Sequence, residues 1–288
     1  MPRPFVIGLA SAVIAGLLPV SAPIAQQADV SFFVAGKVAR YQQDARGALS
    51  PINYMFFAEV FLTKDGKAWE STLEIPGGDG PGGDGTEKAL EYRHSESPLI
   101  NDVMYLSGAA DSKTELDETF PNGEYKFRFK TSSGNITNGV ASFIGARFPK
   151  QPVITFVQDG RAVSVLEVDA SKDLVVTWTP FSEGHADPNG ILDDLIFVAV
   201  DSCTIEDMVH SGRPFEGTKF LTFADTDFRI SAGTLEPGQT YKMYVEHARL
   251  AGTHRVAGIP AFATFAASTY MDFVTLGKTT ASSCPKDP

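Results

Sequence analysis

The segment from Asp187 to Asp194, Asp-Pro-Asn-Gly-Ile-Leu-Asp-Asp, has the residue types best suited to metal chemistry. Asp187, Asn189, Asp193 and Asp194 flank a glycine turn, and calcium takes about six to eight oxygen ligands in proteins. We therefore expect these four residues as calcium ligands, and calcium is the only cofactor that the sequence suggests. The alternative is an acidic turn without an ion, because Asp, Asn, Pro and Gly also build ordinary turns.

Paired carboxylates would suit glycoside hydrolysis, which needs two acidic side chains held about 5–9.5 Å apart. Candidates can be drawn from Glu59, Glu74, Asp193 and Glu246. The chain lacks a Gly-x-Ser-x-Gly turn, a His-Glu-x-x-His zinc pair and a phosphate-binding glycine loop. No catalytic residue is therefore assigned. His247 lies in the same strand register as apolar residues that face inward. We therefore expect it at the edge of the core rather than as a ligand.

The two cysteines, Cys203 and Cys284, both lie in the second half of the chain. An even pair in an exported protein favours a disulfide, here one that would close a loop of about 80 residues. Two free thiols are the alternative. A zinc site is not expected, because the cysteines lack the paired spacing of zinc ligands.

The N-terminus has the pattern of a secretory signal. Arg3 precedes an apolar run from Phe5 to Val20, and small residues follow up to Ala25. The run is shorter than the roughly 20 residues that span a bilayer, so we expect cleavage near residue 25 and no membrane span in the mature chain. An uncleaved anchor is the alternative.

The net charge of −11 becomes −12 once this leader and its single arginine are removed. A net-acidic chain is a poor partner for nucleic acid. These features together predict a protein that is secreted, periplasmic or located at the cell surface.

The remainder of the chain reads as short alternating runs bounded by Gly, Pro, Asn and Asp, the pattern of an all-β protein. The prolines between Phe148 and Pro152 predict a boundary, with β-sandwich domains at 28–148 and 152–280. One run, Tyr54–Leu62, is apolar on both faces, which indicates either cover on both sides or a binding patch.

Two similar segments support this division. Phe120–Phe127 and Leu235–Met243 each place an apolar residue and a Pro/Gly turn before a tyrosine, Tyr125 or Tyr241, that opens a strand. A buried tyrosine hydroxyl needs a partner, which the upstream turn can supply. We therefore predict that both tyrosines belong to the core.

The second half resembles fibronectin type III and related immunoglobulin-like sandwiches. Trp178 ends an alternating strand, a central strand follows from Leu195, and the Leu-x-Pro-Gly-x-x-Tyr turn reaches Tyr241. The resemblance implies that Trp178 fills the core between two sheets. The first half reads as a divergent sandwich, similar to uncharacterised exported bacterial proteins with a Phe-Pro-x-Gly-x-Tyr signature. The fold class expected is therefore two tandem antiparallel β-sandwiches after a signal peptide.

This organisation favours an exported, non-catalytic binding or structural protein of the cell surface, envelope or extracellular matrix, with an extracellular protein or polysaccharide as partner. A carbohydrate-binding module is the first alternative, since aromatic side chains such as Tyr244 could stack on sugar rings. A secreted glycoside-type hydrolase is the second.

Overall fold

The computed structural model describes residues 29–77, 85–95, 101–203 and 207–278. Within these ranges the chain is almost entirely β, and the one helix is the seven-residue α1 (Lys113–Thr119). Ser112 caps α1 by accepting a hydrogen bond from the backbone N–H of Glu115. The prediction of an all-β chain is confirmed. No helix in the described part is long and apolar enough to cross a membrane.

One large sheet runs through the molecule. Its strands lie in the order β13 (Val209–His210), β12 (Leu195–Asp201), β16 (Thr240–Val256), β17 (Ile259–Val274), β1 (Val30–Gln43), β2 (Leu49–Leu62), β6 (Val103–Ala110) and β5 (Glu91–Arg93), and β14 (Leu221–Thr222) also pairs with β12.

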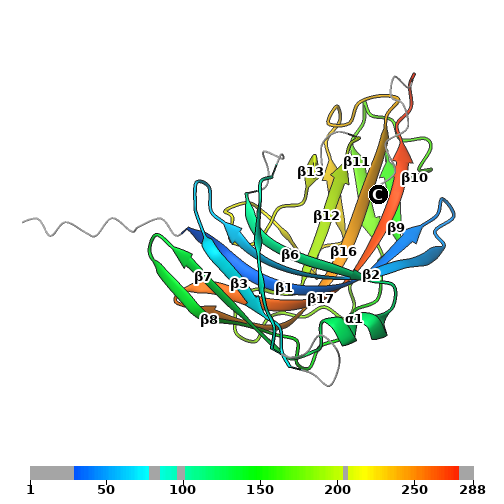
Figure 1. Ribbon diagram of the computed structural model, residues 1–288. Helices are drawn as coiled ribbons and strands as arrows, with labels where there is room; N and C mark the ends of the chain where they lie inside the picture. Colours follow the sequence, from blue (N-terminus) through cyan, green and yellow to red (C-terminus); the bar gives the residue numbers. More distant parts are fainter. Residues whose placement is uncertain (1–28, 78–84, 96–100, 204–206, 279–288) are drawn as a thin grey trace, which may run out of the picture.

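Two smaller sheets accompany the large one. The first has the order β4 (Glu87–Ala89), β3 (Trp69–Glu74), β7 (Glu124–Thr131) and β8 (Gly134–Ser142). The second has the order β10 (Arg161–Val163), β9 (Ile154–Gln158), β11 (Leu174–Trp178) and β15 (Asp227–Ile230). Figure 1 shows the first beside β1 and β2 and the second beside β16, while the long strands β16 and β17 extend along both.

The first small sheet packs on one face of the large sheet, which we call the core face. Strand β7 alternates strictly between buried and more exposed positions, and its buried residues include Tyr125 and Phe127. These pack with Phe33 of β1 and Phe56 of β2, and Phe265 of β17 belongs to the same cluster. The C-terminal strand therefore helps to build the core beneath the N-terminal half.

The second small sheet packs on the same face further along β16 and β17. Trp178 is 6% exposed and lies in this second core with Phe156, Tyr241 and Phe273. The Tyr241 and Phe273 rings are stacked with their centroids 5.3 Å apart. Large aromatic rings fill the space between the sheets, as the sequence predicts.

Both core tyrosines bond to the turn that precedes them. The hydroxyl of Tyr125 donates to the carbonyl oxygen of Pro121 at 2.8 Å. The hydroxyl of Tyr241 instead accepts from the backbone N–H of Glu236 at 2.7 Å. The two similar sequence segments thus perform the same task, tying a turn to its strand, with the hydrogen bond reversed.

The strands β1 and β17 pair in parallel, from Phe33 opposite Ala261 to Gln42 opposite Tyr270. The expectation of purely antiparallel sheets is wrong at this point, because nearly the whole chain separates the two strands and no local pattern reveals their pairing. The large sheet therefore contains strands from both sides of Pro149 and Pro152. The division into separate domains at 28–148 and 152–280 stays a prediction.

A buried glutamine also links the two halves. The side-chain amide of Gln43 donates to the carbonyl oxygen of Ile154 at 2.8 Å and accepts from its backbone N–H at 2.7 Å. Gln43 is 5% exposed, so both bonds lie away from water. The side chain thereby pairs with the first residue of β9 as a neighbouring strand would.

We expect Gln43→Leu to lower the free energy of unfolding by about 2–4 kcal/mol, because it leaves two buried backbone groups of Ile154 without partners. Urea denaturation followed by tryptophan fluorescence would measure the change. Gln42→Leu is the matched control, since among the described residues the Gln42 side chain contacts only its neighbour's carbonyl oxygen, at 3.5 Å. Equal stability of Gln43→Leu and Gln42→Leu would contradict the bridging role.

Candidate functional site

The face of the large sheet opposite the two small sheets, the loop face, carries the candidate site. Phe32, Phe61 and Phe262 stack on it, with ring centroids 4.2 Å apart for Phe32–Phe61 and 5.5 Å apart for Phe32–Phe262. Leu192 from the connection before β12 and Phe215 from the connection after β13 pack on these rings. Two connections from the second half of the chain therefore cover part of this face.

Beside these apolar rings lies a polar group, the loop-face cluster, made of Arg40, Glu59, Arg213, Tyr244, Glu246 and Tyr270. Period-two alternation along β1, β2, β16 and β17 places five of them on the loop face, and Arg213 arrives from the connection after β13. All six side chains are half-buried. The structure thus gathers residues that lie up to 230 positions apart in the chain.

Ring and guanidinium contacts hold the cluster together. The Arg40 guanidinium lies 4.6 Å from the centre of the Tyr270 ring, and the Tyr244 and Tyr270 ring centroids are 5.3 Å apart. Arg213 lies 4.8 Å from the centre of the Phe61 ring. The Ser268 hydroxyl donates a hydrogen bond to the Glu246 carboxylate. The arrangement presents acceptors, donors and aromatic faces side by side.

Both carboxylates of the cluster hold protons unusually tightly. Burial raises the pKa of Glu246 to about 7, against the opposing effects of the Ser268 hydroxyl and Arg40. Burial likewise raises the pKa of Glu59 to about 7; Arg213 and Arg93 oppose the shift, and the Glu246 carboxylate adds to it. At neutral pH each group is therefore poised between its acid and its carboxylate.

Several buried polar atoms on this side of the molecule lack a partner within the described residues. They are Nε of Arg40, Oδ1 of Asn53, Nη1 of Arg213 and Oε1 of Glu216. Arg40 and Asn53 are cross-strand neighbours in register. Buried polar groups in folded proteins are nearly always hydrogen-bonded, so such a concentration indicates a place that water or a ligand completes.

Of the four carboxylates considered for glycoside chemistry, the structure brings Glu59 and Glu246 to one face. Glu74 lies on the first small sheet, where it pairs with Lys126 at 2.7 Å and Arg128 at 2.5 Å. Asp193 lies in the connection before β12, and its Oδ1 accepts from the backbone N–H of Asp187 at 2.9 Å. Tyr244, considered for sugar stacking, belongs to the loop-face cluster.

His247 lies on the core face, 2% exposed. Its ring stacks on Phe181 with centroids 4.5 Å apart, and Nδ1 lies 3.3 Å from the carbonyl oxygen of Lys150. Burial lowers the pKa of His247 to about 4, so the ring is neutral at physiological pH. This placement is that of a packed core histidine.

The Asp187 segment forms a tight loop organised by its own carboxylates. Asp187 accepts from the backbone N–H groups of Asn189, Ile191 and Leu192 and from the hydroxyl of Thr253 at 2.6 Å. Burial opposes ionisation, but these hydrogen bonds outweigh it and lower the pKa of Asp187.

Asp194 organises the other end of the same loop. It is 2% exposed and accepts from the backbone N–H of Leu250 at 2.8 Å and from Nδ1 of His185 at 2.6 Å. The amide of Asn189 donates to the Thr253 carbonyl oxygen at 3.0 Å. The described residues contain no group of three or more His, Cys, Asp and Glu side chains arranged for a metal. Calcium at this loop stays a prediction.

The predicted disulfide involves Cys284, which lies outside the described residues, as does the predicted signal segment 1–25. The sulfur of Cys203 lies 3.9 Å from the carbonyl oxygen of Thr240. The pairing of Cys203 with Cys284 therefore stays a prediction.

Three members of the loop-face cluster are not predicted from the sequence: Arg40, Arg213 and Tyr270. The alternation of β17 identifies Tyr270 as a residue of the face opposite the core, but only the pairing with β1 brings Arg40 to it. Arg213 lies outside any strand, so no periodicity marks it. For Arg40 and Tyr270, the available signal is the row of polar residues on one face of long, otherwise apolar strands.

Comparison with known proteins assigns no family to this chain. No known protein family and no curated protein matches it. Among solved structures it is similar to the adhesin InvE of Yersinia pseudotuberculosis, with 9% sequence identity and a TM-score of 0.18. The likeness covers 80% of this chain and 58% of the adhesin chain, so this chain spans less than two thirds of that length. A TM-score this low supports no conclusion about fold or function.

The pKa of Glu246 generates a prediction about pH. Because the folded pKa of about 7 lies above the ordinary value of 4.5, the stability that Glu246 contributes in acid is lost as pH rises through about 4.5–7. Glu246→Gln should therefore match the wild type near pH 4.5 and exceed its free energy of unfolding by up to about 3 kcal/mol at pH 8.

Urea denaturation across this pH range measures the effect. Glu118→Gln, at an exposed site on α1, is the control. If the free energies of unfolding of the wild type and Glu246→Gln differ by the same amount from pH 4.5 to 8, the raised pKa of Glu246 is refuted.

Asp187→Asn should lower the free energy of unfolding by about 2–4 kcal/mol, because an amide group would face backbone N–H donors in place of a carboxylate oxygen. Asp65→Asn, in an exposed turn with a positive φ of 65° that asparagine tolerates, is the control.

Thermal unfolding of the wild type and of Asp187→Asn, with calcium and with a chelator, tests the ion. A calcium-dependent unfolding midpoint in the wild type that Asp187→Asn abolishes would support a calcium site.

Proposed function

We propose that the protein is an exported carbohydrate-binding protein and that the loop-face cluster is its binding site. The observation that carries the proposal is the set of half-buried acceptors, donors and rings on one face, with buried polar atoms left unpaired beside them. The proposal combines two expectations from the sequence, an exported binding protein and a carbohydrate ligand.

The chemistry of the cluster suits a sugar better than an apolar ligand. Hydroxyl groups both donate and accept, so they can donate to Glu59 and Glu246 and accept from the guanidinium groups of Arg40 and Arg213. The C–H face of a pyranose can pack on Tyr270 or Tyr244, whose rings retain partial exposure. A purely apolar ligand would leave the buried polar atoms unpaired, at a cost in binding free energy.

Ligand hydroxyls would also offset the unfavourable free energy of ionising the two carboxylates of the cluster. Ionising Glu59 and Glu246 at neutral pH is unfavourable because burial shields both carboxylates from part of the surrounding water. Hydroxyl donors from a sugar would stabilise the ionised form and lower both pKa values. Binding should therefore release protons between about pH 6 and 8.

A glycan array with the intact protein, followed by titration calorimetry on any retained oligosaccharide, tests the proposal. Glu246→Gln and Tyr270→Ala should each weaken binding by about tenfold or more, which corresponds to about 1.4 kcal/mol. The controls are Glu118→Gln and Tyr92→Ala, both at exposed positions outside the cluster.

Three results would contradict the proposal. One is an array without retention, and another is wild-type affinity in both cluster variants while both remain folded. The third is release of new reducing ends from a bound glycan, which would replace binding by hydrolysis.

A further inference from the structure

Four polar side chains of the loop face form one row across four strands, which we call the polar row. Arg40 of β1 is paired directly with Asn53 of β2 and with Ser268 of β17, and Ser268 is paired with Glu246 of β16. Directly paired residues of neighbouring strands point to the same face of a sheet. Since neighbouring strands lie about 4.8 Å apart, the row extends about 14 Å across the strands.

One end of the polar row has an unpaired donor beside an unpaired acceptor. Nε of Arg40 and Oδ1 of Asn53 are buried and have no hydrogen-bond partner among the described residues. Both side chains as a whole are only half-buried, so a ligand on this face can reach the two atoms after a small change of side-chain torsion. A guanidinium N–H only donates, and an amide carbonyl oxygen only accepts. The pair is therefore complementary to a group that accepts at one atom and donates at the next, as an amide does.

An apolar row lies next to this donor and acceptor. Two residues along the strands, Val38 of β1 is paired with Met55 of β2 and with Ala266 of β17. These three side chains belong to the apolar cluster of the loop face. Val38 is buried, whereas Met55 keeps partial exposure. A methyl group beside Met55 would leave water and pack against carbon atoms, which favours binding.

Two tyrosine rings border the polar row on its other side. Tyr270 lies two residues beyond Ser268 on β17, and it is paired with Tyr244 of β16. The two ring centroids are 5.3 Å apart, and both rings are half-buried. Hydrogen-bonding groups therefore lie between an apolar strip and a pair of rings on which a sugar can pack.

We propose that the polar row binds an N-acetylated amino sugar, an assignment that rests on carbohydrate binding at the loop face. The acetamido carbonyl oxygen accepts from Nε of Arg40, its N–H donates to Oδ1 of Asn53, and its methyl group packs on the apolar row. The pyranose ring packs beside Tyr270, and hydroxyl groups further along the sugar chain donate to Glu246. A peptide offers the same amide but no hydroxyl groups for the carboxylate end of the row, so a sugar satisfies more of it.

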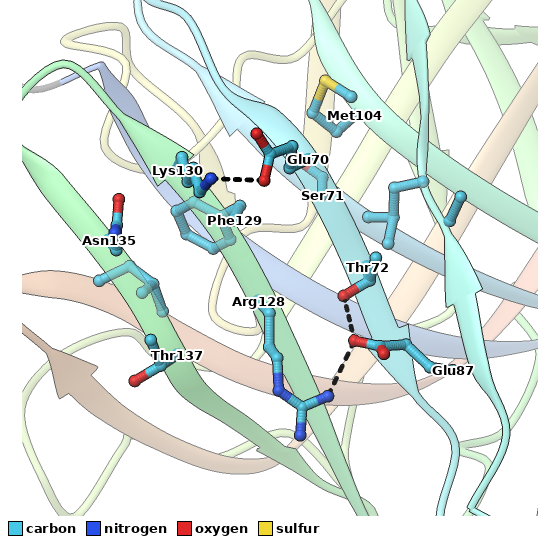
Figure 2. Close-up of a pocket in the computed structure, with 13 residues that line it drawn as sticks. Glu70, Ser71, Thr72, Glu87, Met104, Arg128, Phe129, Lys130, Asn135 and Thr137 are labelled. Carbon is cyan, nitrogen blue, oxygen red and sulfur yellow. Dashed lines mark hydrogen bonds and ion pairs between the residues drawn. The ribbon is translucent and has the colours of Figure 1, made fainter.

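The pocket on the first small sheet supplies matched control positions. Figure 2 shows Arg128 in this pocket, where it pairs with Glu87 at 3.0 Å. Asn135 lines the same pocket and is exposed. Arg128→Gln and Asn135→Leu therefore change an arginine and an asparagine that lie on another sheet than the polar row.

Titration calorimetry of the full chain with the N-acetylglucosamine trimer of chitin tests the proposal. Cellotriose, which has a hydroxyl group in place of each acetamido group, is the comparison ligand. We expect saturable binding of the N-acetylated trimer and binding about tenfold or more weaker for cellotriose, because the hydroxyl group lacks the methyl contact and the second hydrogen bond of the amide.

The outcomes separate this proposal from the proposed function. Equal affinity for the two trimers would overturn the acetamido assignment and leave carbohydrate binding intact. Failure to bind the N-acetylated trimer, with other glycans retained on the array, would overturn it in the same way. An array without any retention would contradict carbohydrate binding itself.

Variants test the two atoms that contact the acetamido group. Asn53→Leu and Arg40→Gln should each weaken binding of the N-acetylated trimer about tenfold, which corresponds to about 1.4 kcal/mol. The controls Asn135→Leu and Arg128→Gln should bind it like the wild type. Wild-type affinity in a folded Asn53→Leu or Arg40→Gln would overturn the assignment. If neither variant folds, the comparison of the two trimers on the wild type still decides the proposal.

Discussion

The parallel pairing of β1 with β17 is the constraint on which the rest of the structure depends. It joins the first long strand of the described chain to the last, and β16 and β2 extend the sheet on either side. Both cores need it, because Phe265 of β17 packs under the first small sheet while Phe273 of the same strand packs under the second. The loop-face cluster needs it too, because Arg40 reaches Tyr270 only across this pair.

The buried charged groups of the molecule differ in the partners that surround them. Lys37 is fully buried on the core face, and its Nζ donates to Asp117 at 2.8 Å and to Asn122 at 2.7 Å. These bonds tie α1 and the turn before Tyr125 to β1, so the charge is compensated and its role is structural. Burial raises the pKa values of Glu59 and Glu246 in the loop-face cluster, and the neighbouring arginines and Ser268 only partly oppose it. The candidate site is therefore marked by buried carboxylates whose neighbours do not fully offset the effect of burial.

Sequence reasoning succeeds here where the signal is local. The turn before Tyr125 and Tyr241 and the strand that follows occupy neighbouring positions, and the structure places both rings in the cores. The apolar run Tyr54–Leu62 indicates a strand covered on both faces or a binding patch, and in β2 Phe56 lies in the first core while Phe61 packs on the loop face. Pairing between distant parts of the chain leaves no such trace, so neither the assembly of the loop-face cluster nor the Gln43–Ile154 contact could be predicted. Composition alone could not distinguish carboxylates that organise a loop, as Asp187 does, from carboxylates that bind an ion.

The loop-face cluster favours a hydroxyl-rich ligand because of how its polar groups are paired. On the loop face, several buried nitrogen and oxygen atoms have no partner among the residues that the structure describes, and tyrosine rings lie beside them. A ligand therefore gains by supplying many neutral hydrogen bonds over a broad face.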